Sequence, residues 1–313
     1  MLLILGSLLG GLLLLTAGAE GLIRGAASLA RRFGLSPLVV GLTVVAFGTS
    51  TPEFVVSLQG ALDGRGALAI GNVVGSNIGN IGLILGGAAL ITPLRVQAQI
   101  IRIDVPIMLG VTLLLGGFLW DGQISRVEGA ILATGIVVYT GMTIALARRG
   151  DSPAVQDEFE EGVPSQHPMW QDLLFVLGGF GFLVGGGQLL VSAAVTIAQQ
   201  FGVSETVIGL TIVGIGTSLP ELATSILAAA RGAGDIAVGN VVGSNIFNIL
   251  GILGPVALVQ PLSVGTLSWV DAGVMVGFAL LLLPLTRTQF ILLRWEGAVL
   301  LGLYSGYLVY LIF

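Results

Sequence analysis

Apolar stretches follow one another along the whole chain of 313 residues. Each holds close to or above the roughly twenty residues that a membrane-spanning helix requires. The breaks between them are short, and the only long polar stretch runs from Arg148 to Asp172. The pattern predicts an all-α membrane protein with ten transmembrane helices, at residues 2–30, 38–62, 67–91, 103–121, 126–147, 170–199, 206–230, 235–259, 267–286 and 290–312.

The sequence repeats itself at an offset of 168 residues. Between residues 41–94 and 209–262, 31 of 54 aligned positions are identical, so the chain is an internal duplication. Each half holds five predicted spans, and homologous halves with an odd number of crossings enter the membrane from opposite sides. We therefore expect a first five-helix repeat at 1–147, a cytoplasmic linker loop at 148–169 and a second, inverted five-helix repeat at 170–313.

Arginine residues collect on the cytoplasmic side of membrane proteins, and this chain has no lysine to complicate the comparison. With the N-terminus outside, the outward loops hold only Arg65 and Arg126. The inward loops then hold ten: Arg24, Arg31, Arg32, Arg95, Arg102, Arg148, Arg149, Arg231, Arg287 and Arg294. This distribution predicts an integral protein of a prokaryotic inner membrane with its N-terminus outside.

The composition agrees with a lipid environment and excludes several kinds of site. Hydrophobic residues make up 55% of the chain and charged residues 9%, with a mean hydropathy of +1.01. Because cysteine is absent, disulfides, thiolate metal sites and cysteine nucleophiles are excluded. The one histidine, His167, lies in the long polar stretch, which argues against a histidine metal site. Neither catalysis nor a resident cofactor is expected.

Two acidic residues lie about midway along apolar segments. Glu53 ends the motif GTSTPE at 48–53, and Glu221 ends its repeat, GTSLPE, at 216–221. A charge in hydrocarbon costs at least about 2.5 kcal/mol and is tolerated mainly where function or pairing offsets that cost. No basic residue lies at matching depth along the sequence. A proton or a bound cation is therefore expected to balance each carboxylate.

A proline stands just before each acid, at Pro52 and Pro220. Proline lacks an N–H group and crowds the carbonyl four residues earlier, so each helix should kink or unwind at this point. Irregular backbone at this depth lines a cavity or is packed in protein, and broken helices of this kind form ion sites in transporters. Freed carbonyls become candidate ligands, together with the hydroxyls of Thr49, Ser50, Thr217 and Ser218.

The following span of each half carries a polar face, in the motif GNVVGSNIGN at 71–80 and its repeat GNVVGSNIFN at 239–248. The motifs place Ser76 one turn from Asn80, and Ser244 one turn from Asn248, so these four side chains join the candidate site. For the other asparagines, an ion-binding role and simple hydrogen bonding between helices both stay open: Asn72, Asn77, Asn240 and Asn245.

The candidate ligands are all oxygen atoms, from carboxylates, hydroxyls, amides and carbonyls. Such ligands suit Ca2+, Na+ or Mn2+ rather than Zn2+ or copper, and Mg2+ is disfavoured because it dehydrates reluctantly. Two carboxylates carry a charge of −2, which one Ca2+ or two monovalent ions neutralise. Since binding of one load excludes the other, this competition supplies a physical basis for exchange.

The remaining charged residues are expected to have structural roles. Glu20 and Arg24 are four residues apart and should form a local pair. Five acids near span ends are expected to be interfacial charges: Asp104, Asp121, Glu128, Asp271 and Glu296. Four tryptophans near predicted span ends are typical of an aromatic belt: Trp120, Trp170, Trp269 and Trp295.

The two motifs, each present twice, resemble the paired alpha repeats of the sodium/calcium exchanger family, within the calcium/cation antiporters. The resemblance is strongest over the 54-residue repeats, and the ten-span layout extends it over nearly the whole chain. It implies that Na+ and Ca2+ compete for a central cluster of sites while the long first and sixth helices slide across a fixed core. The ligands it implies are Thr49, Ser50, Glu53, Ser76, Asn80 and the carbonyl of Ala46, with Thr217, Ser218, Glu221, Ser244, Asn248 and the carbonyl of Gly214.

One position departs from the family pattern. Many sodium/calcium exchangers carry an aspartate where this chain has Asn248, whereas proton-driven relatives often have asparagine. We therefore expect exchange of Ca2+ for Na+ by alternating access at a two-glutamate site, with H+/Ca2+ exchange as the alternative. A cation channel is a third reading, in which flux would need no counter-ion. The expected substrates are Ca2+ and Na+ in a lipid bilayer, and no nucleic acid is involved.

Overall fold

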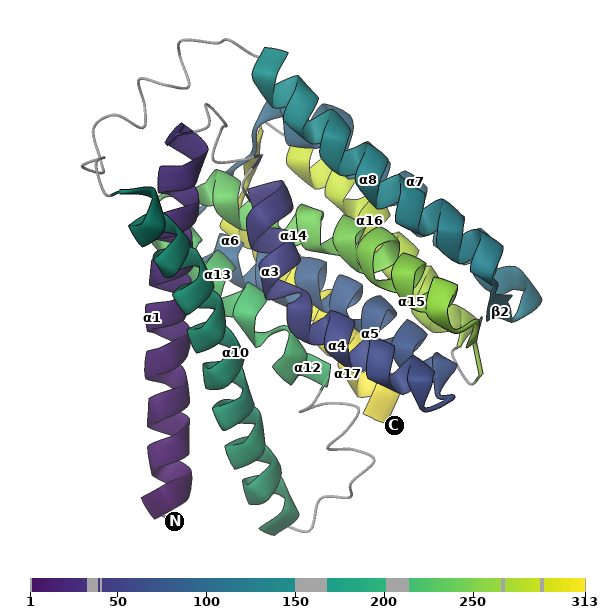
Figure 1. The fold of residues 1–313 in the computed structure, drawn as a ribbon, viewed down its shortest axis with the longest axis horizontal. Helices are drawn as coiled ribbons and strands as arrows, with labels where there is room; N and C mark the ends of the chain where they lie inside the picture. The colour runs from purple at the N-terminus through teal and green to yellow at the C-terminus, as the bar shows by residue number, and fades with distance from the viewer. Residues whose placement is uncertain are drawn as a thin grey trace.

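The computed structural model describes residues 2–32, 39, 41–149, 168–200, 214–265, 268–287 and 290–312, which are mostly helical (Figure 1). The linker that the sequence predicts at 148–169 lies largely outside these residues. The elements of the first half are α1 (Leu2–Arg32), η1 (Gly41–Val45), α3 (Ala46–Thr49), α4 (Thr51–Leu62), α5 (Gly66–Gly79), η2 (Asn80–Leu85), α6 (Gly86–Ile91), β1 (Leu94–Arg95), η3 (Ile100–Asp104), α7 (Val105–Phe118), η4 (Leu119–Asp121), β2 (Gln123–Ile124) and α8 (Arg126–Arg149).

The second half repeats this order of elements. They are α10 (Met169–Gln200), α12 (Gly214–Thr217), α13 (Leu219–Ala230), α14 (Gly234–Phe247), η6 (Asn248–Leu253), α15 (Gly254–Val259), β3 (Leu262–Ser263), α16 (Trp269–Arg287), β4 (Ile291–Leu292) and α17 (Arg294–Ile312). The bounds of α4, α5, η2, α6, β1 and β2 recur residue for residue at the 168-residue offset. The duplication in the sequence is therefore also a duplication of secondary structure.

Six described helices are long and apolar enough to cross a membrane: Ile4–Leu29, Gly66–Ile91, Ile100–Asp121, Arg126–Leu146, Met169–Ala193 and Gly234–Val259. A bent pair, Gly41–Thr49 with Thr51–Leu62, makes a further candidate, and Leu219–Ala230 and Trp269–Leu285 are shorter apolar helices. Large apolar side chains cover the outer surface, with Leu13 on α1 72% exposed and Val137 on α8 70% exposed. Such a surface needs lipid around it, so the chain is an integral membrane protein.

The two halves contact each other through short strand pairs and through the core. β1 pairs antiparallel with β4, with Leu94 opposite Leu292, and β2 pairs with β3, with Gln123 opposite Ser263. The middle of the bundle is made by the most buried spans, Gly66–Ile91 and Gly234–Val259. The strands of one half thus pair with those of the other, and equivalent spans of the two halves make up the core.

The helices α1 and α10 lie side by side along one flank of the bundle (Figure 1). They have a hydrophobic cluster of their own, which includes Leu15, Leu22 and Leu183. Glycines let the two backbones approach closely, since a Cβ atom on Gly18 would stand 2.8 Å from the carbonyl oxygen of Gly179. The two long helices are therefore packed more closely on each other than on the rest of the bundle.

We predict that Gly18→Ala lowers the thermal unfolding midpoint of the detergent-solubilised protein by several degrees. Overpacking of a close interface costs about 1–3 kcal/mol, which exceeds the gain in helix propensity of up to about 1 kcal/mol. Gly10→Ala is the matched control, because a Cβ atom at Gly10 would meet nothing within 4 Å. Equal midpoints for the two variants would show that the α1–α10 contact is not close at Gly18.

Candidate cation-binding site

Both glutamate-bearing helices are broken just before the acid, as the prolines predict. The segment Gly41–Thr49 meets Thr51–Leu62 at an angle of 51°. Ser50 occupies this break with φ −83° and ψ 8°, and Ser218 occupies the break between α12 and α13 with φ −89° and ψ 9°. Glu53 and Glu221 therefore lie in the first turns of α4 and α13, where the helix dipole favours an acidic side chain.

The sequence predicted that the proline leaves backbone carbonyls before the acid without hydrogen-bond donors, and the structure does not show this in the first half. Ser50 N donates to the carbonyl oxygen of Ala46 at 3.1 Å, and the carbonyl of Gly48 also accepts a backbone N–H group. The bond from Ser50 N to Ala46 keeps the i to i−4 spacing of an α-helix, so the helical hydrogen bonds continue up to the break. The expectation that Pro52 leaves these carbonyls without partners is therefore wrong. Gly214, whose carbonyl is the counterpart of the Ala46 carbonyl in the second half, is the first residue of α12.

Each carboxylate is bound by a hydroxyl from the opposite half. Ser50 Oγ donates to Glu221 Oε1 at 2.9 Å, and Ser218 Oγ donates to Glu53 Oε1 at 3.0 Å. The side chains of Thr49 and Thr217 also interact with Glu221 and Glu53, respectively. In the sequence these hydroxyls stand three and four residues before the acid of their own half. The breaks turn them instead toward the acid of the other half, so the two halves build one site.

The second oxygen of each carboxylate has no hydrogen-bond partner. Glu53 and Glu221 are 0% and 1% exposed, and Oε2 of each is buried without a partner. In the part of the chain that the structure describes, the ion pairs join Glu20 to Arg24 and Arg231, and Arg32 to Asp172, so neither central glutamate is paired with a base. Two carboxylate oxygens thus have no hydrogen-bond donor in the protein interior, where an unpaired polar atom costs free energy.

The polar face of the following span meets the carboxylates. Ser218 Oγ, which binds Glu53, lies 3.4 Å from Ser76 Oγ. At Asn80 and Asn248 the α-helices change to π-helical turns, η2 and η6, a feature often found at functional sites. Three further buried oxygens lack partners here: Asn80 Oδ1, Asn248 Oδ1 and Ser244 Oγ.

The two neighbouring carboxylates, with Ser50, Ser218 and Ser76, form a cluster of oxygen atoms. Among the described residues, no group of three or more His, Cys, Asp and Glu side chains could hold a metal ion. The cluster therefore offers two acids and several neutral oxygens. Such a set limits its full charge to −2 and suits a hard cation with many oxygen ligands.

Two asparagines that the sequence argument left undecided hold the broken helices in place. Asn72 Nδ2 donates to the backbone carbonyl of Glu53 at 3.2 Å and to Ser57 Oγ at 3.0 Å. Asn240 repeats this contact with the carbonyl of Glu221 at 3.5 Å and Ser225 Oγ at 3.0 Å. These contacts are hydrogen bonds between helices. Because Asn72 and Asn240 occupy equivalent positions of the repeat, the sequence already indicated that the two residues have the same role.

A cavity of about 310 Å3 lies along α10, beside both helix breaks. Its lining includes Thr217 from the candidate site, Pro52 and Pro220 from the two breaks, and Gln188 and Ser192 from α10. Just before the break at Ser50, the ring of Phe180 on α10 lies where a Cβ atom on Gly48 would stand.

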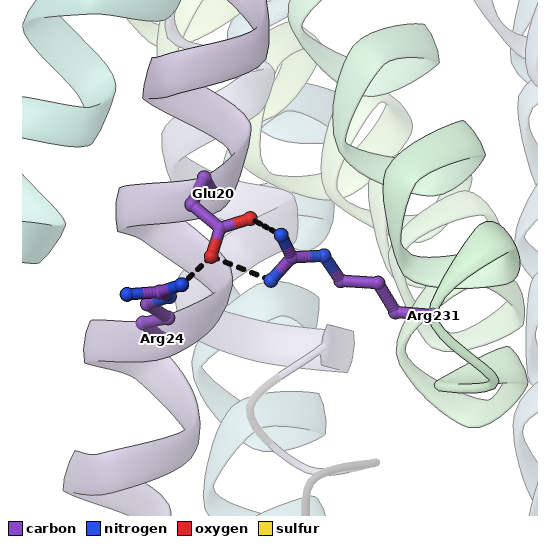
Figure 2. A network of polar contacts seen from close by, with 3 residues as sticks. All are labelled: Glu20, Arg24 and Arg231. Carbon is purple, nitrogen blue, oxygen red and sulfur yellow. Dashed lines mark hydrogen bonds and ion pairs between the residues drawn. The ribbon is translucent and has the colours of Figure 1, made fainter. Parts of the chain in front are cut away.

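Charged residues elsewhere have partners that the sequence argument partly foresaw. Glu20 binds Arg24 within α1, as expected, and also Arg231 at the end of α13 (Figure 2). Asp104 is 0% exposed and accepts a hydrogen bond from Tyr139 at 3.1 Å, and Asp271 accepts one from Tyr307 at 2.8 Å. The side chain of Asp104 is therefore covered by α8, which supplies its hydrogen-bond donor, Tyr139.

The sequence profile described as "Sodium/calcium exchanger protein" matches residues 3–145 and 172–313, which is most of the chain. The chain belongs to the sodium/calcium exchanger family. Among its curated relatives, a protein of Alkalimonas amylolytica named as the antiporter CaxA is 40% identical over 97% of this chain and 96% of its own. The sodium/calcium exchanger MaX1 of Methanosarcina acetivorans is 33% identical over 98% and 97% of the two chains.

A solved structure of the sodium-calcium exchanger NCX_Mj, soaked with Na+ and Sr2+, superposes with a TM-score of 0.83 at 33% identity, over 97% of each chain. This likeness extends over both halves of the exchanger. The resemblance drawn from the two motifs is therefore confirmed at the level of family and fold.

We predict that Ca2+ raises the thermal unfolding midpoint of this exchanger and that Glu53→Gln or Glu221→Gln reduces the shift. A ligand that binds only the folded state adds about 2.7 kcal/mol at a concentration one hundred times its Kd, and loss of one carboxylate weakens that binding. Asp104→Asn is the matched control, since it removes a buried acid outside the site. A full Ca2+ shift in both glutamine variants would rule these acids out as ligands.

Proposed function

We propose that this exchanger moves Ca2+ across the membrane in return for Na+, by alternating access at a site centred on Glu53 and Glu221. The observation that carries the proposal is the pair of buried carboxylates, each with an oxygen that has no hydrogen-bond partner. One Ca2+ or two Na+ balance the charge of −2 equally well. Because both loads use the same oxygens, one must leave before the other binds.

The proposed ligands are the two acids and polar side chains of the broken helices and of the spans that follow them. They are Glu53, Thr49, Ser50, Ser76 and Asn80 with Glu221, Thr217, Ser218, Ser244 and Asn248, and the carbonyls of Ala46 and Gly214 remain proposals from the family resemblance. Ca2+ takes six to eight oxygen ligands, so such a set could hold it without a third acid. MaX1 and NCX_Mj, both described as sodium/calcium exchangers, support Na+ as the driving ion.

We further propose that the chain has ten transmembrane helices in two inverted repeats, at 1–147 and 170–313, joined by a cytoplasmic loop at 148–169. The contacts support an axis that exchanges the halves, because the pairing of β1 with β4 becomes the pairing of β3 with β2 at the 168-residue offset. The arginine distribution supports an outer N-terminus, in an inner membrane. In this orientation the cavity along α10 faces outward.

Calcium flux into proteoliposomes tests the driving ion. We predict Ca2+ uptake when an outward Na+ gradient is imposed at constant pH, and little uptake when a pH gradient is imposed without Na+. Glu53→Gln and Glu221→Gln should each lower the Na+-driven rate at least about a hundredfold, because a binding site that lacks a carboxylate no longer balances either load. Uptake driven only by the pH gradient would favour the H+/Ca2+ alternative, and uptake without any counter-ion gradient would favour a channel.

The ion pair between Glu20 and Arg231 joins α1 to the end of α13, at the proposed inner end (Figure 2). Glu20 on α1 binds Arg231 on α13, whereas the residues at the equivalent positions of the other end are Gln188 and Asp63, which cannot form this pair. The proposed inner end thus has an ionic link between α1 and α13, and the equivalent positions Gln188 and Asp63 cannot repeat it at the outer end. We propose that this link favours the outward-facing state.

We predict that Glu20→Gln raises the inward-facing population about two- to fivefold, since a partly exposed ion pair is worth roughly 0.2–1 kcal/mol. The chain has no cysteine, so Ala223→Cys, which lies against the α1–α10 cluster, gives a single reporter. Its labelling rate in inside-out vesicles by an impermeant maleimide should rise by that factor. Arg24→Gln is the control, because it removes a charge from the same cluster and keeps the link to Arg231. An equal rise in both variants would contradict the proposal.

A further inference from the structure

Four buried asparagines from the two halves meet at the centre of the bundle. Asn77 and Asn80 come from the end of α5 and the start of η2, and Asn245 and Asn248 come from the end of α14 and the start of η6. All four are at most 2% exposed. Asn80 and Asn248 belong to the proposed ligands, whereas Asn77 and Asn245 have no role in the function proposed so far.

The hydrogen bonds of Asn77 determine which way Asn248 faces. Asn77 Nδ2 donates to the backbone carbonyl of Asn245 at 3.2 Å, and a carbonyl oxygen can only accept, so the amide nitrogen must lie on this side. Asn77 Oδ1 is thereby left to accept from Asn248 Nδ2, at 3.0 Å. Asn248 has its nitrogen engaged, and its own Oδ1 remains buried without a partner.

A second chain of bonds acts on Asn80 in the same way. Asn245 Nδ2 donates to the thioether sulfur of Met108 at 3.5 Å, and a thioether also accepts without donating. Asn245 Oδ1 then accepts from Asn80 Nδ2 at 3.1 Å, which leaves Asn80 Oδ1 buried and without a partner. Both chains thus begin at a group that cannot donate and end at an unpartnered amide oxygen.

We propose that Asn77 and Asn245 are positioning residues that hold the amides of Asn248 and Asn80 with oxygen, and not nitrogen, toward the transported cation. The inference rests on the proposed function, in which a cation occupies the space beside Glu53 and Glu221. A flipped amide would turn its NH2 group toward that cation, and the site would lose an oxygen ligand and gain a repulsive dipole. Partners that orient the ligands of a metal commonly affect its affinity by about ten- to a hundredfold.

The two chains differ in strength. The chain that orients Asn248 begins at a backbone carbonyl, and the chain that orients Asn80 begins at the sulfur of Met108, which is a weak acceptor. The orientation of Asn248 is therefore held more firmly than that of Asn80. Loss of Met108 as an acceptor should have a smaller effect than loss of Asn77.

A double-mutant cycle tests the proposal, because a carboxylate has oxygen at both positions and needs no orienting partner. The four proteins are the wild type, Asn77→Leu, Asn248→Asp and the double variant, each reconstituted in proteoliposomes. We expect Asn77→Leu to raise the half-saturating Ca2+ concentration about tenfold with the maximal rate changed less than about twofold. In the N248D background the same change should raise it less than about twofold. The added charge of N248D is present in both proteins of that comparison and cancels.

An equal rise in both backgrounds would overturn the proposal, since it would mean that Asn77 supports the fold and does not orient Asn248. Thr143→Val is the matched control, because the Thr143 hydroxyl is buried and bonds only within α8, to the carbonyl of Tyr139. It should leave the half-saturating concentration unchanged. Failure of the proposed function has a different signature, because Glu53→Gln and Glu221→Gln would then transport Ca2+ normally.

If Asn77→Leu does not fold, the second chain gives an independent test. Met108→Leu conserves volume in the core and removes only the sulfur acceptor. It should raise the half-saturating Ca2+ concentration about two- to threefold, less than the loss of a stronger partner. The N80D background should abolish that rise. A rise of equal size in the N80D background, or no rise in either, would overturn the proposal for Asn80.

Discussion

Two carboxylates at the centre of the bundle, each with one oxygen that has no hydrogen-bond partner, are the constraint on which the rest of the structure depends. Each has a hydroxyl partner for its other oxygen, from Ser50 or Ser218, and neither has a base beside it. Such groups are too costly to leave uncompensated in a low-dielectric interior. In the proposed function, a cation that enters and leaves the site compensates them, and the charge of the site is thereby linked to transport.

The surrounding elements can be understood as means of meeting this requirement. The breaks at Ser50 and Ser218 turn hydroxyls from each half toward the acid of the other, so neither half contains a complete site. Asn72 and Asn240 tie the broken helices to the next span through the backbone of the two acids. The closely packed pair of α1 and α10 lies along one flank of this frame.

Much of this could be predicted from the sequence, because duplication and proline are strong local signals. The 168-residue repeat, the breaks before Glu53 and Glu221, and the absence of a paired base among the described residues all follow from reading the chain. The crossing of Ser50 to Glu221 could not be predicted, since a break sends a side chain in a direction that local spacing does not encode. The π-helical turns at Asn80 and Asn248, and the cover over Asp104, depend on packing between helices distant in sequence.

The most direct measurement of the central claim is an experimental structure of the exchanger with Sr2+ in place of Ca2+, located by its anomalous signal. We predict a strong peak within metal–oxygen bonding distance of both Glu53 Oε2 and Glu221 Oε2. The amide oxygens of Asn80 and Asn248 should be turned toward that peak. The account would be contradicted by a structure at saturating Sr2+ that has no peak there, or in which an arginine reaches either carboxylate.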